Sequence, residues 1–380
     1  MHCSLFCRVI DNYGDIGVCW RLARQLVHEH GWQLTLWVDD LASFARIAPA
    51  LDVAQARQRL DGIEVRHWAD TLPADAAVGE VVIEAFACEL PEAYQQAMAA
   101  QAQRPLWLNL EYLSAEDWVE GCHGLPSPHP RLPLQKYFFF PGFTPRTGGL
   151  LCEQALLAER DAWQADIAAQ HVYWQARGVP PCPPSGVRYS LFAYDSPAAA
   201  QWVQQLAAGS QPVQLLLPMG KVVPDVLQAL GLPADAGAGQ HYQCGQLALY
   251  LLPMSDQRGY DRLLWSCDFN VVRGEDSFLR AQWAGRPFAW HIYRQDDDAH
   301  IDKLNAFLQH YCHAMPPALA AAVQDYMLQW NHNRLSGEAW PAVQAQWPAW
   351  QLHAAAWPGQ ILAGGSLAQR LVQFAEIRLQ

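Results

Sequence analysis

The chain has 380 residues, a length that suits two domains of ordinary size better than one. Hydrophobic residues make up 51% of the chain and charged residues 16%, a composition that excludes an intrinsically disordered protein. The net charge is −12 and the sequence contains no Lys/Arg-rich run, which argues against binding to nucleic acid or to an anionic membrane surface.

The first half of the chain alternates segments typical of strands with segments typical of helices. The expected strands are short apolar runs at residues 4–10, 32–38, 63–68, 81–86, 105–110 and 136–140. Helices are expected at residues 17–30 and 41–48. This alternation predicts a parallel sheet with helices on both faces.

Four prolines within Pro180–Pro184 interrupt the chain near its midpoint and predict a linker, since proline continues neither a helix nor a central strand. The alternation then restarts, with strands expected at 188–193, 212–217, 247–252, 268–272 and 286–292, and helices at 197–208, 260–267 and 276–285. The remainder, from residue 298, is expected to be helical, with its tryptophans holding these helices to the body.

The predicted organisation is two Rossmann-like domains, residues 1–179 and 180–360, with parallel sheets that face a central cleft. The last helix, at about residues 361–380, is expected to pack back on the first domain. The ten cysteines form no C-x-x-C pair, so no metal site is predicted. The sequence shows no signal peptide and no apolar run of the ~20 residues that a membrane span needs, so we expect a cytoplasmic chain with reduced thiols.

The segment Asp11–Gly17 lies where the first predicted strand turns into the first helix. Ligands of open α/β sheets bind outside the carboxyl ends of the strands, so this loop is expected at a binding site. Gly14 and Gly17 let the backbone approach a ligand closely. The carboxylates of Asp11 and Asp15 suit a cationic or hydroxyl-bearing substrate better than a phosphate. The alternative is that Asp15 only caps the helix and that Asp11 only fixes a turn.

A second motif, Arg273-Gly274-Glu275-Asp276-Ser277, again joins a strand to a helix. Gly274 allows close approach, and the backbone N–H groups of Asp276 and Ser277 suit a diphosphate at the start of the helix. Glu275 is better suited to sugar hydroxyls than to phosphate. The alternative is that Asp276 or Ser277 caps the helix and that Glu275 lies on the surface.

Further candidate binding residues lie close to this motif. Gln257 can read the edge of a base, although a solvated loop side chain is the simpler interpretation. Phe192 and Tyr194 can stack on a base or ribose, although core packing is the simpler interpretation for Phe192. His291 is interpreted as a structural histidine with its hydrogen bonds satisfied.

Five motifs together resemble a known family, the bacterial protein-arginine rhamnosyltransferases that modify translation elongation factor P (the EarP family). They are Val9–Arg24, Leu108–Leu113, Pro141–Phe143, Tyr260–Trp265 and Arg273–Phe278. The resemblance covers most of the chain. It implies the α/β GT-B fold and a glycosyltransferase with dTDP-β-L-rhamnose as the donor and an arginine of elongation factor P as the acceptor. It also implies inversion at the anomeric carbon, with neither a cofactor nor a metal.

The resemblance places the essential aspartates at Asp11 and Asp15 and the essential glutamate at Glu275. The binding residues expected from the motifs and the resemblance together are Asn12, Tyr13, Gly14, Gly17, Phe192, Tyr194, Leu252, Gln257, Tyr260, Arg273, Gly274, Asp276 and Ser277. Because Leu252 is not aromatic, stacking on the thymine is not expected at that position.

The chemistry of arginine suits these carboxylates. A guanidinium has a pKa above ~12 and is a poor nucleophile because its nitrogen lone pairs are delocalised. We therefore expect Asp15 to act as the general base, Asp11 to orient the guanidinium and Glu275 to position the donor. The alternatives are a GT-B enzyme with a small-molecule or lipid acceptor and a non-catalytic nucleotide-sugar sensor. A nicotinamide-dependent oxidoreductase is disfavoured by the lack of a G-x-G-x-x-G motif.

Overall fold

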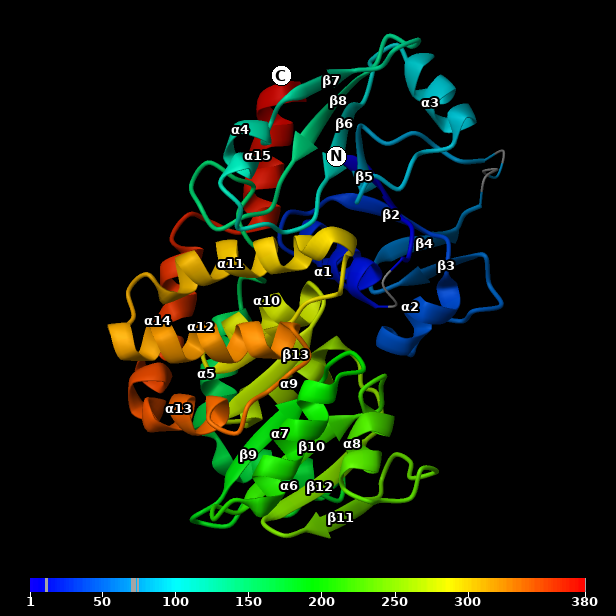
Figure 1. Ribbon diagram of the computed structural model, residues 1–380. Helices are drawn as coiled ribbons and strands as arrows, with labels where there is room; N and C mark the ends of the chain where they lie inside the picture. Colours follow the sequence, from blue (N-terminus) through cyan, green and yellow to red (C-terminus); the bar gives the residue numbers. More distant parts are fainter. Residues whose placement is uncertain (11–12, 70–72, 74, 380) are drawn as a thin grey trace. The chain divides into compact units, whose positions relative to one another are not determined.

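The computed structural model of the protein describes residues 1–10, 13–69, 73 and 75–379, and the chain divides into two compact units (Figure 1). The first unit comprises Met1–Gln154 together with Ile361–Gln380, and the second comprises Ala155–Gln360. Each unit contains its own mainly parallel sheet with helices packed against it. Among the described residues, no helix combines the length and the hydropathy that crossing a membrane requires.

The sheet of the first unit has, within the described residues, the strand order β3-β4-β2-β1-β5-β6-β8-β7. The strands are β1 (His2–Cys7), β2 (Gln33–Val38), β3 (Arg57–Leu60), β4 (Ile63–His67), β5 (Val81–Ala85), β6 (Leu106–Leu110), β7 (Pro126–Pro128) and β8 (Gln135–Phe139). The edge strands β3 and β7 pair antiparallel with their neighbours, and the strands between them are parallel. The parallel strands follow the Rossmann order, which changes direction between β1 and β5; Cys3 of β1 pairs with Leu34 on one side and Val81 on the other.

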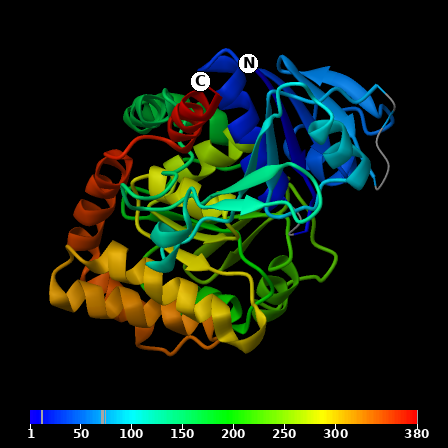
Figure 2. The ribbon, with the colours of Figure 1, turned by 90° about the horizontal axis from the view of Figure 1, so that it is seen from above.

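The helices of the first unit include one that comes from the far end of the chain. They are α1 (Gly14–His28), α2 (Leu41–Ile47), α3 (Glu92–Ala99), α4 (Trp118–Cys122) and α15 (Leu367–Leu379). The C-terminal α15 contacts α1 and β6. In Figure 2 it is the red helix that ends at the label C, near the blue N-terminal segment. Phe374 packs edge-on against Tyr137 and Phe139, with ring centroids 5.8 and 5.6 Å away. Arg370 donates to the carbonyl of Pro145 at 3.0 Å, which fastens the start of α15 to the loop after β8.

The sheet of the second unit has, within the described residues, the order β11-β12-β10-β9-β13-β14. Its strands are β9 (Val187–Leu191), β10 (Val213–Pro218), β11 (His241–Cys244), β12 (Leu247–Leu252), β13 (Phe269–Arg273) and β14 (Phe288–His291). Only β11 runs antiparallel among these described strands, at one edge. The parallel strands again follow the Rossmann order, and here it changes direction between β9 and β13.

Helices and tryptophans complete the second unit. The helices are α5 (Leu156–Ala165), α6 (Ile167–Gln175), α7 (Pro197–Ala208), α8 (Val223–Ala229), α9 (Gln257–Ser266), α10 (Asp276–Trp283), the 3₁₀ turn η1 (Asp296–Asp298), α11 (Ala299–Cys312), α12 (Pro317–Asn331), α13 (Ala339–Ala345) and α14 (Trp347–Leu362). Phe269 of β13 contacts the rings of Trp340, Trp347 and Trp350. These aromatic contacts confirm that tryptophans hold the late helices to the sheet.

The boundary between the units differs from the predicted one. The sequence predicts a division at residue 179, but α5 and α6 belong to the second unit. Trp163 of α5 donates its indole N–H to Ser266 at 2.9 Å, and Arg160 donates to the carbonyl of Trp283 at 2.8 Å. The proline run lies inside the second unit, where Gln214 donates to the carbonyl of Pro180 at 3.1 Å. Ile361–Gln380 group with the first unit.

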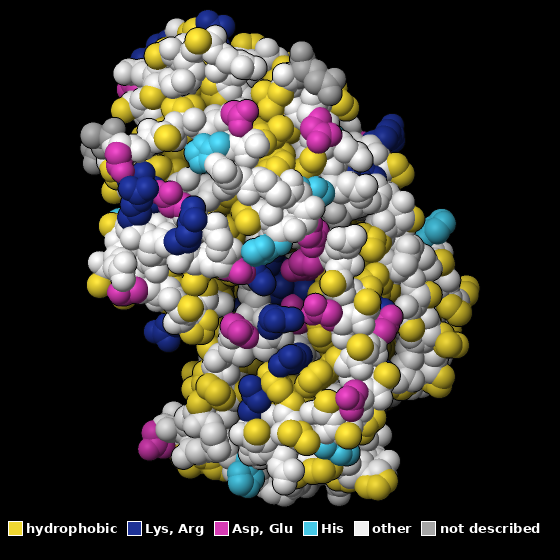
Figure 3. Space-filling model, turned by 180° about the vertical axis from the view of Figure 1, so that it is seen from behind, with side chains coloured by type: hydrophobic (Ala, Val, Ile, Leu, Met, Phe, Trp, Pro, Cys, Tyr) yellow, Lys and Arg dark blue, Asp and Glu magenta, His cyan; other side chains and the backbone are white. Residues whose placement is uncertain are grey.

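The surface mixes side chains of opposite charge. On the face drawn in Figure 3, Lys and Arg side chains lie among Asp and Glu side chains and hydrophobic ones. All ten cysteines are free thiols, and most of them are buried. Burial raises the pKa of the Cys3 thiol well above its usual range.

Candidate active site

Asp15 is the described member of the predicted acidic pair, and it lies at the carboxyl end of β1. It is the second residue of α1, whose N-cap position is Tyr13, so the capping interpretation of Asp15 is wrong. Its side chain is 2% exposed. One carboxylate oxygen, Oδ2, accepts a hydrogen bond from the backbone N–H of Ile10 at 2.7 Å, and Oδ1 accepts one from the hydroxyl of Tyr112 at 3.0 Å. The carboxylate is thus held in a defined orientation.

The other residues of this motif take different positions. Asp11 and Asn12 lie outside the described residues. Tyr13 and Gly14 are half-buried at the start of α1, and Gly17 is buried within the helix, where its N–H donates to the carbonyl of Tyr13 at 2.9 Å. The described part of the motif, residues 13–17, thus lies at the start of α1, which follows β1 where the strand order changes direction.

Tyr112 is a residue of this site that the sequence analysis did not single out. It follows β6 within the motif Leu108–Leu113, and its ring is partly exposed to solvent. The neighbouring Glu111 is half-buried, and burial raises the pKa of its carboxyl group above the usual range. The signal in the sequence was the position of a polar, aromatic motif directly after a buried strand.

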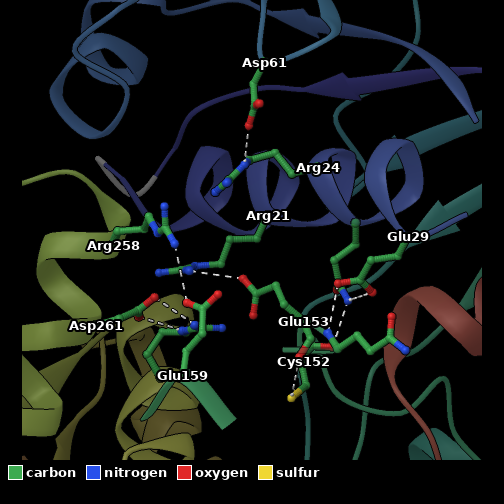
Figure 4. A network of polar contacts seen from close by, with 12 residues as sticks. Arg21, Arg24, Glu29, Asp61, Cys152, Glu153, Glu159, Arg258 and Asp261 are labelled. Atoms are coloured by element: carbon green, nitrogen blue, oxygen red, sulfur yellow. Dashed lines mark hydrogen bonds and ion pairs between the residues drawn. The ribbon is translucent and has the colours of Figure 1, made fainter. Parts of the chain in front are cut away.

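Ion pairs fasten α1 to its surroundings in the first unit. Figure 4 shows Arg21, which is buried, directed at Glu153, with 3.3 Å between guanidinium and carboxylate, and Arg24 directed at Asp61 at 2.7 Å. Removing one member of a pair that includes a buried charge leaves the other uncompensated. These contacts keep the helix that carries Asp15 in place.

Arg273 is the first residue of the second predicted motif and the last residue of β13. It is 6% exposed, and its guanidinium lies over the rings of Phe192 and Tyr194, at 4.5 and 4.8 Å from their centroids. The two aromatic residues follow β9 and are themselves buried. Both rings therefore make a cation–π contact with Arg273.

The helix α10 begins at Asp276, two residues after Gly274, which has a φ of +62°. Glu275 takes the N-cap position, so the alternative in which Asp276 or Ser277 caps the helix is wrong. All three side chains are half-buried. The carbonyl of Gly274 accepts a hydrogen bond from the indole of Trp290 at 2.9 Å, which fixes the turn that presents the first N–H groups of α10.

Three more predicted residues lie on β12 and α9. Gln257 is buried at the start of α9, so its interpretation as a solvated loop residue is wrong. The ring of Tyr260 packs edge-on against Phe192 at 5.6 Å, and burial raises the pKa of its hydroxyl above the usual range. Leu252 is buried in a core cluster with Leu216. Its side chain therefore supports the strand end and is part of the core.

Buried polar atoms in and beside the second motif lack a hydrogen-bond partner among the described residues. Among the residues that the structure describes, Nη1 of Arg273 and Nδ1 of His291 are buried without a hydrogen-bond partner. His291 is therefore not the satisfied structural histidine that the sequence suggested. Burial lowers its pKa to about 4, so it is neutral at pH 7. A buried guanidinium with a spare donor, beside a neutral imidazole and a helix N-terminus, suits an anionic ligand.

A buried ion pair joins the two helices of this site. Arg280 of α10 donates to both carboxylate oxygens of Asp261 of α9 at 2.8 Å. Figure 4 shows Asp261 on α9, together with Arg258, which is directed at Glu159 with 3.6 Å between their charged groups. The bidentate pair fixes α9 against α10. Within the described ranges, no group of three His, Cys, Asp or Glu side chains is placed to hold a metal ion.

Comparison of the sequence with known families gives one match over nearly the whole chain. The family described as "Elongation-Factor P (EF-P) rhamnosyltransferase EarP" matches residues 3–376. A protein-arginine rhamnosyltransferase of Pseudomonas putida is 52% identical over 372 residues, which cover 98% of this chain and 97% of that protein. A protein-arginine rhamnosyltransferase of Neisseria meningitidis is 38% identical over 98% of this chain and 96% of its own length.

Solved structures agree with these relatives. A structure that concerns the structural basis for EarP-mediated arginine glycosylation of translation elongation factor EF-P has a TM-score of 0.72 and 37% identity over 99% of both chains. A UDP-glucosyltransferase from Polygonum tinctorium has a TM-score of 0.52 at 11% identity, over 99% of this chain and 98% of its own, and is similar in fold alone. The prediction of an α/β GT-B fold with two Rossmann-like domains is confirmed.

Proposed function

Since the chain belongs to the EarP family of elongation-factor P rhamnosyltransferases, which are protein-arginine glycosyltransferases, we propose that it transfers L-rhamnose from dTDP-β-L-rhamnose to an arginine of elongation factor P. The reaction inverts the anomeric carbon and uses no metal. Elongation factor P is the acceptor that the name of the family specifies. Because that acceptor is a translation factor, the reaction takes place in the cytoplasm.

One observation carries the acceptor side of this proposal, namely the buried and doubly held carboxylate of Asp15. A guanidinium becomes a nucleophile only when a proton leaves as its nitrogen attacks. In the proposed step the nitrogen forms a bond to the anomeric carbon, the bond from that carbon to the diphosphate oxygen breaks, and Asp15 takes the proton. Asp11, which lies outside the described residues, is proposed to orient the guanidinium.

The donor side of the proposal uses the second unit. The dTDP that leaves carries the bonding electrons away as negative charge on its diphosphate. The guanidinium of Arg273 and the N–H groups at the start of α10 supply positive charge for that diphosphate. Gln257, Tyr260 and Ser277 are proposed to line the nucleotide site, and Glu275 to contact the sugar.

The proposal is tested by incubating the protein with elongation factor P and a panel of nucleotide sugars, followed by measurement of intact mass. We expect a mass gain of one deoxyhexose with dTDP-β-L-rhamnose, retained in the presence of EDTA, and an α-linked product by NMR. The same assay decides between the alternatives. An enzyme with a small-molecule or lipid acceptor leaves elongation factor P unmodified while consuming the donor, and a non-catalytic sensor binds the donor without consuming it.

A further inference from the structure

We propose that Tyr112 and Phe86 are positioning residues that hold the carboxylate of Asp15 for proton transfer, an inference that rests on the proposed function. The hydroxyl of Tyr112 donates to Oδ1 of Asp15 at 3.0 Å. The backbone N–H of Ile10 occupies the other oxygen, Oδ2, at 2.7 Å. Two donors on different oxygens fix the plane of a carboxylate, and a general base acts only from a defined plane and distance.

The ring of Tyr112 is itself held by a neighbouring aromatic ring. Phe86 lies parallel to it, with 4.3 Å between centroids and 15° between planes. Phe86 is buried, whereas Tyr112 is partly exposed. A partly exposed tyrosine ordinarily exchanges between rotamers, and stacking on a fixed ring restricts this exchange. Phe86 therefore determines where the hydroxyl of Tyr112 points.

The backbone around Phe86 has an unusual conformation. Phe86, Ala87 and Glu89 have φ values of +56°, +52° and +58°, although none is glycine. Side chains other than glycine rarely adopt this region, and a bulky residue such as phenylalanine does so at a cost in free energy. Such strain persists where the surroundings enforce it, and it is concentrated at functional sites.

The surroundings that enforce this conformation come from two strands. The backbone N–H of Ala87 donates to the side-chain oxygen of Asn109 on β6 at 3.2 Å, and the N–H of Phe86 donates to the carbonyl of Leu110 at 2.7 Å. The N–H of Glu89 donates to Oε1 of Glu84 on β5 at 3.0 Å. Two buried polar side chains and one backbone carbonyl thus hold the strained turn against β5, which precedes it, and β6, which follows it.

The second carboxylate oxygen of Glu84 accepts hydrogen bonds that hold this side chain in place. Oε2 accepts from the indole of Trp107 and from the ammonium of Lys136, both at 3.1 Å. Glu84 is buried, so the ion pair with Lys136 compensates its charge. The support for the turn therefore extends across β5, β6 and β8, all of which belong to the first unit.

The place of this turn in the sheet agrees with a functional role. It follows β5, and Asp15 follows β1, and the strand order changes direction between these two strands. The carboxyl ends of the strands at such a change form the ligand site of Rossmann-like sheets. This strained turn carries Phe86, whose ring stacks on Tyr112, and Tyr112 contacts the proposed base.

Tyr112→Phe in the full-length protein tests the inference, because it removes the hydroxyl and keeps the stacked ring. At saturating dTDP-β-L-rhamnose and elongation factor P we expect kcat to fall by roughly ten- to one-hundred-fold, since misplacement of a reacting group is costly. The KM for elongation factor P, the Kd for dTDP and the melting temperature should stay at their wild-type values. Phe86→Leu, which removes the stacked ring, should also lower kcat.

Tyr242→Phe is the matched control. The hydroxyl of Tyr242, on β11 of the second unit, also donates to a side chain, Gln240, at 3.2 Å, so the same group and the same type of contact are removed away from the site. We expect this variant to keep wild-type kcat. A kcat of Tyr112→Phe within about two-fold of wild type overturns the inference, as does an equal fall in Tyr242→Phe. Failure of the wild type to modify elongation factor P would instead refute the proposed function.

Discussion

Asp15 and Arg273 are buried ionisable residues, and each is supported by groups from other elements. Donors on both oxygens of the Asp15 carboxylate fix its orientation, and one of these donors is a tyrosine 97 residues away in the chain. Arg273 has two aromatic rings against its guanidinium and keeps Nη1 without a hydrogen-bond partner among the described residues. Because both groups are already buried, the free-energy cost of removing water from them does not have to be met when a ligand binds.

Arg273→Lys is predicted to weaken the binding of dTDP. Lysine retains the charge, but its ammonium cannot lie flat between Phe192 and Tyr194 and has no planar fork for phosphate oxygens. We expect the Kd for dTDP, measured by calorimetry, to rise by on the order of ten-fold, which corresponds to about 1.4 kcal/mol. Unchanged affinity would place the diphosphate elsewhere.

Arg258→Lys is the control for this substitution. Arg258 lies on α9 of the same unit, and its contact with Glu159 at 3.6 Å is exposed to solvent. Exposed ion pairs contribute little to stability. This variant should therefore bind dTDP with wild-type affinity, and a loss equal to that of Arg273→Lys would point to a general effect of removing an arginine from the second unit.

At the scale of elements, the turn after β5 has a strained backbone and carries the ring that stacks on Tyr112. Ala87 is exposed and has a φ of +52°, a conformation that glycine adopts without a steric penalty. The replacement Ala87→Gly removes this strain but increases the conformational freedom of the unfolded chain and of the turn. We predict that the free energy of unfolding stays the same or rises by up to ~1 kcal/mol, while kcat falls several-fold.

The measurements for Ala87→Gly are urea denaturation and turnover with elongation factor P. Asp297→Gly is the control, because Asp297 is exposed, has a φ of +55° and belongs to η1 in the second unit. It should show the same small effect on stability and wild-type kcat. If Ala87→Gly kept full activity, the rigidity of the turn would have no part in the reaction.

At the scale of the whole molecule, the last helix completes a unit that the chain began some 350 residues earlier. Leu371 of α15 is fully buried, so Leu371→Ala leaves a cavity in the first unit. We predict a loss of roughly 2–5 kcal/mol in the unfolding free energy of the first unit, with an unchanged Kd for dTDP. Urea denaturation and calorimetry measure the two quantities.

Ile377→Ala on the same helix is the control for Leu371→Ala. Ile377 is 73% exposed, so its truncation should change stability by less than about 0.5 kcal/mol. If Leu371→Ala weakened dTDP binding, the assignment of the nucleotide to the second unit would be contradicted. The comparison therefore tests whether dTDP binds to the second unit independently of the stability of the first.

Periodicity in the sequence predicted most of the regular structure. Runs of buried apolar residues, such as those of β5 and β12, indicate central parallel strands, and the predicted bounds agree with the structure to within a few residues. The edge strands β3, β7 and β11 were not predicted, because they are short and carry polar or proline residues. The proline run suggested a boundary at residue 179, since local breaks in a pattern do not reveal which sheet the neighbouring helices contact.

The sequence by itself determined the fold class, the family resemblance and the two motifs, because each depends on residues that are close together in the chain. Only the tertiary structure decided the partners of these motifs. Local rules favour a helix cap for Asp15, whereas the structure pairs it with Tyr112, which reaches it because β1, β5 and β6 are neighbours in the sheet. In the same way, β9 and β13 bring Phe192 and Tyr194 to Arg273. Contacts between distant segments follow from strand order, which no short stretch of sequence encodes.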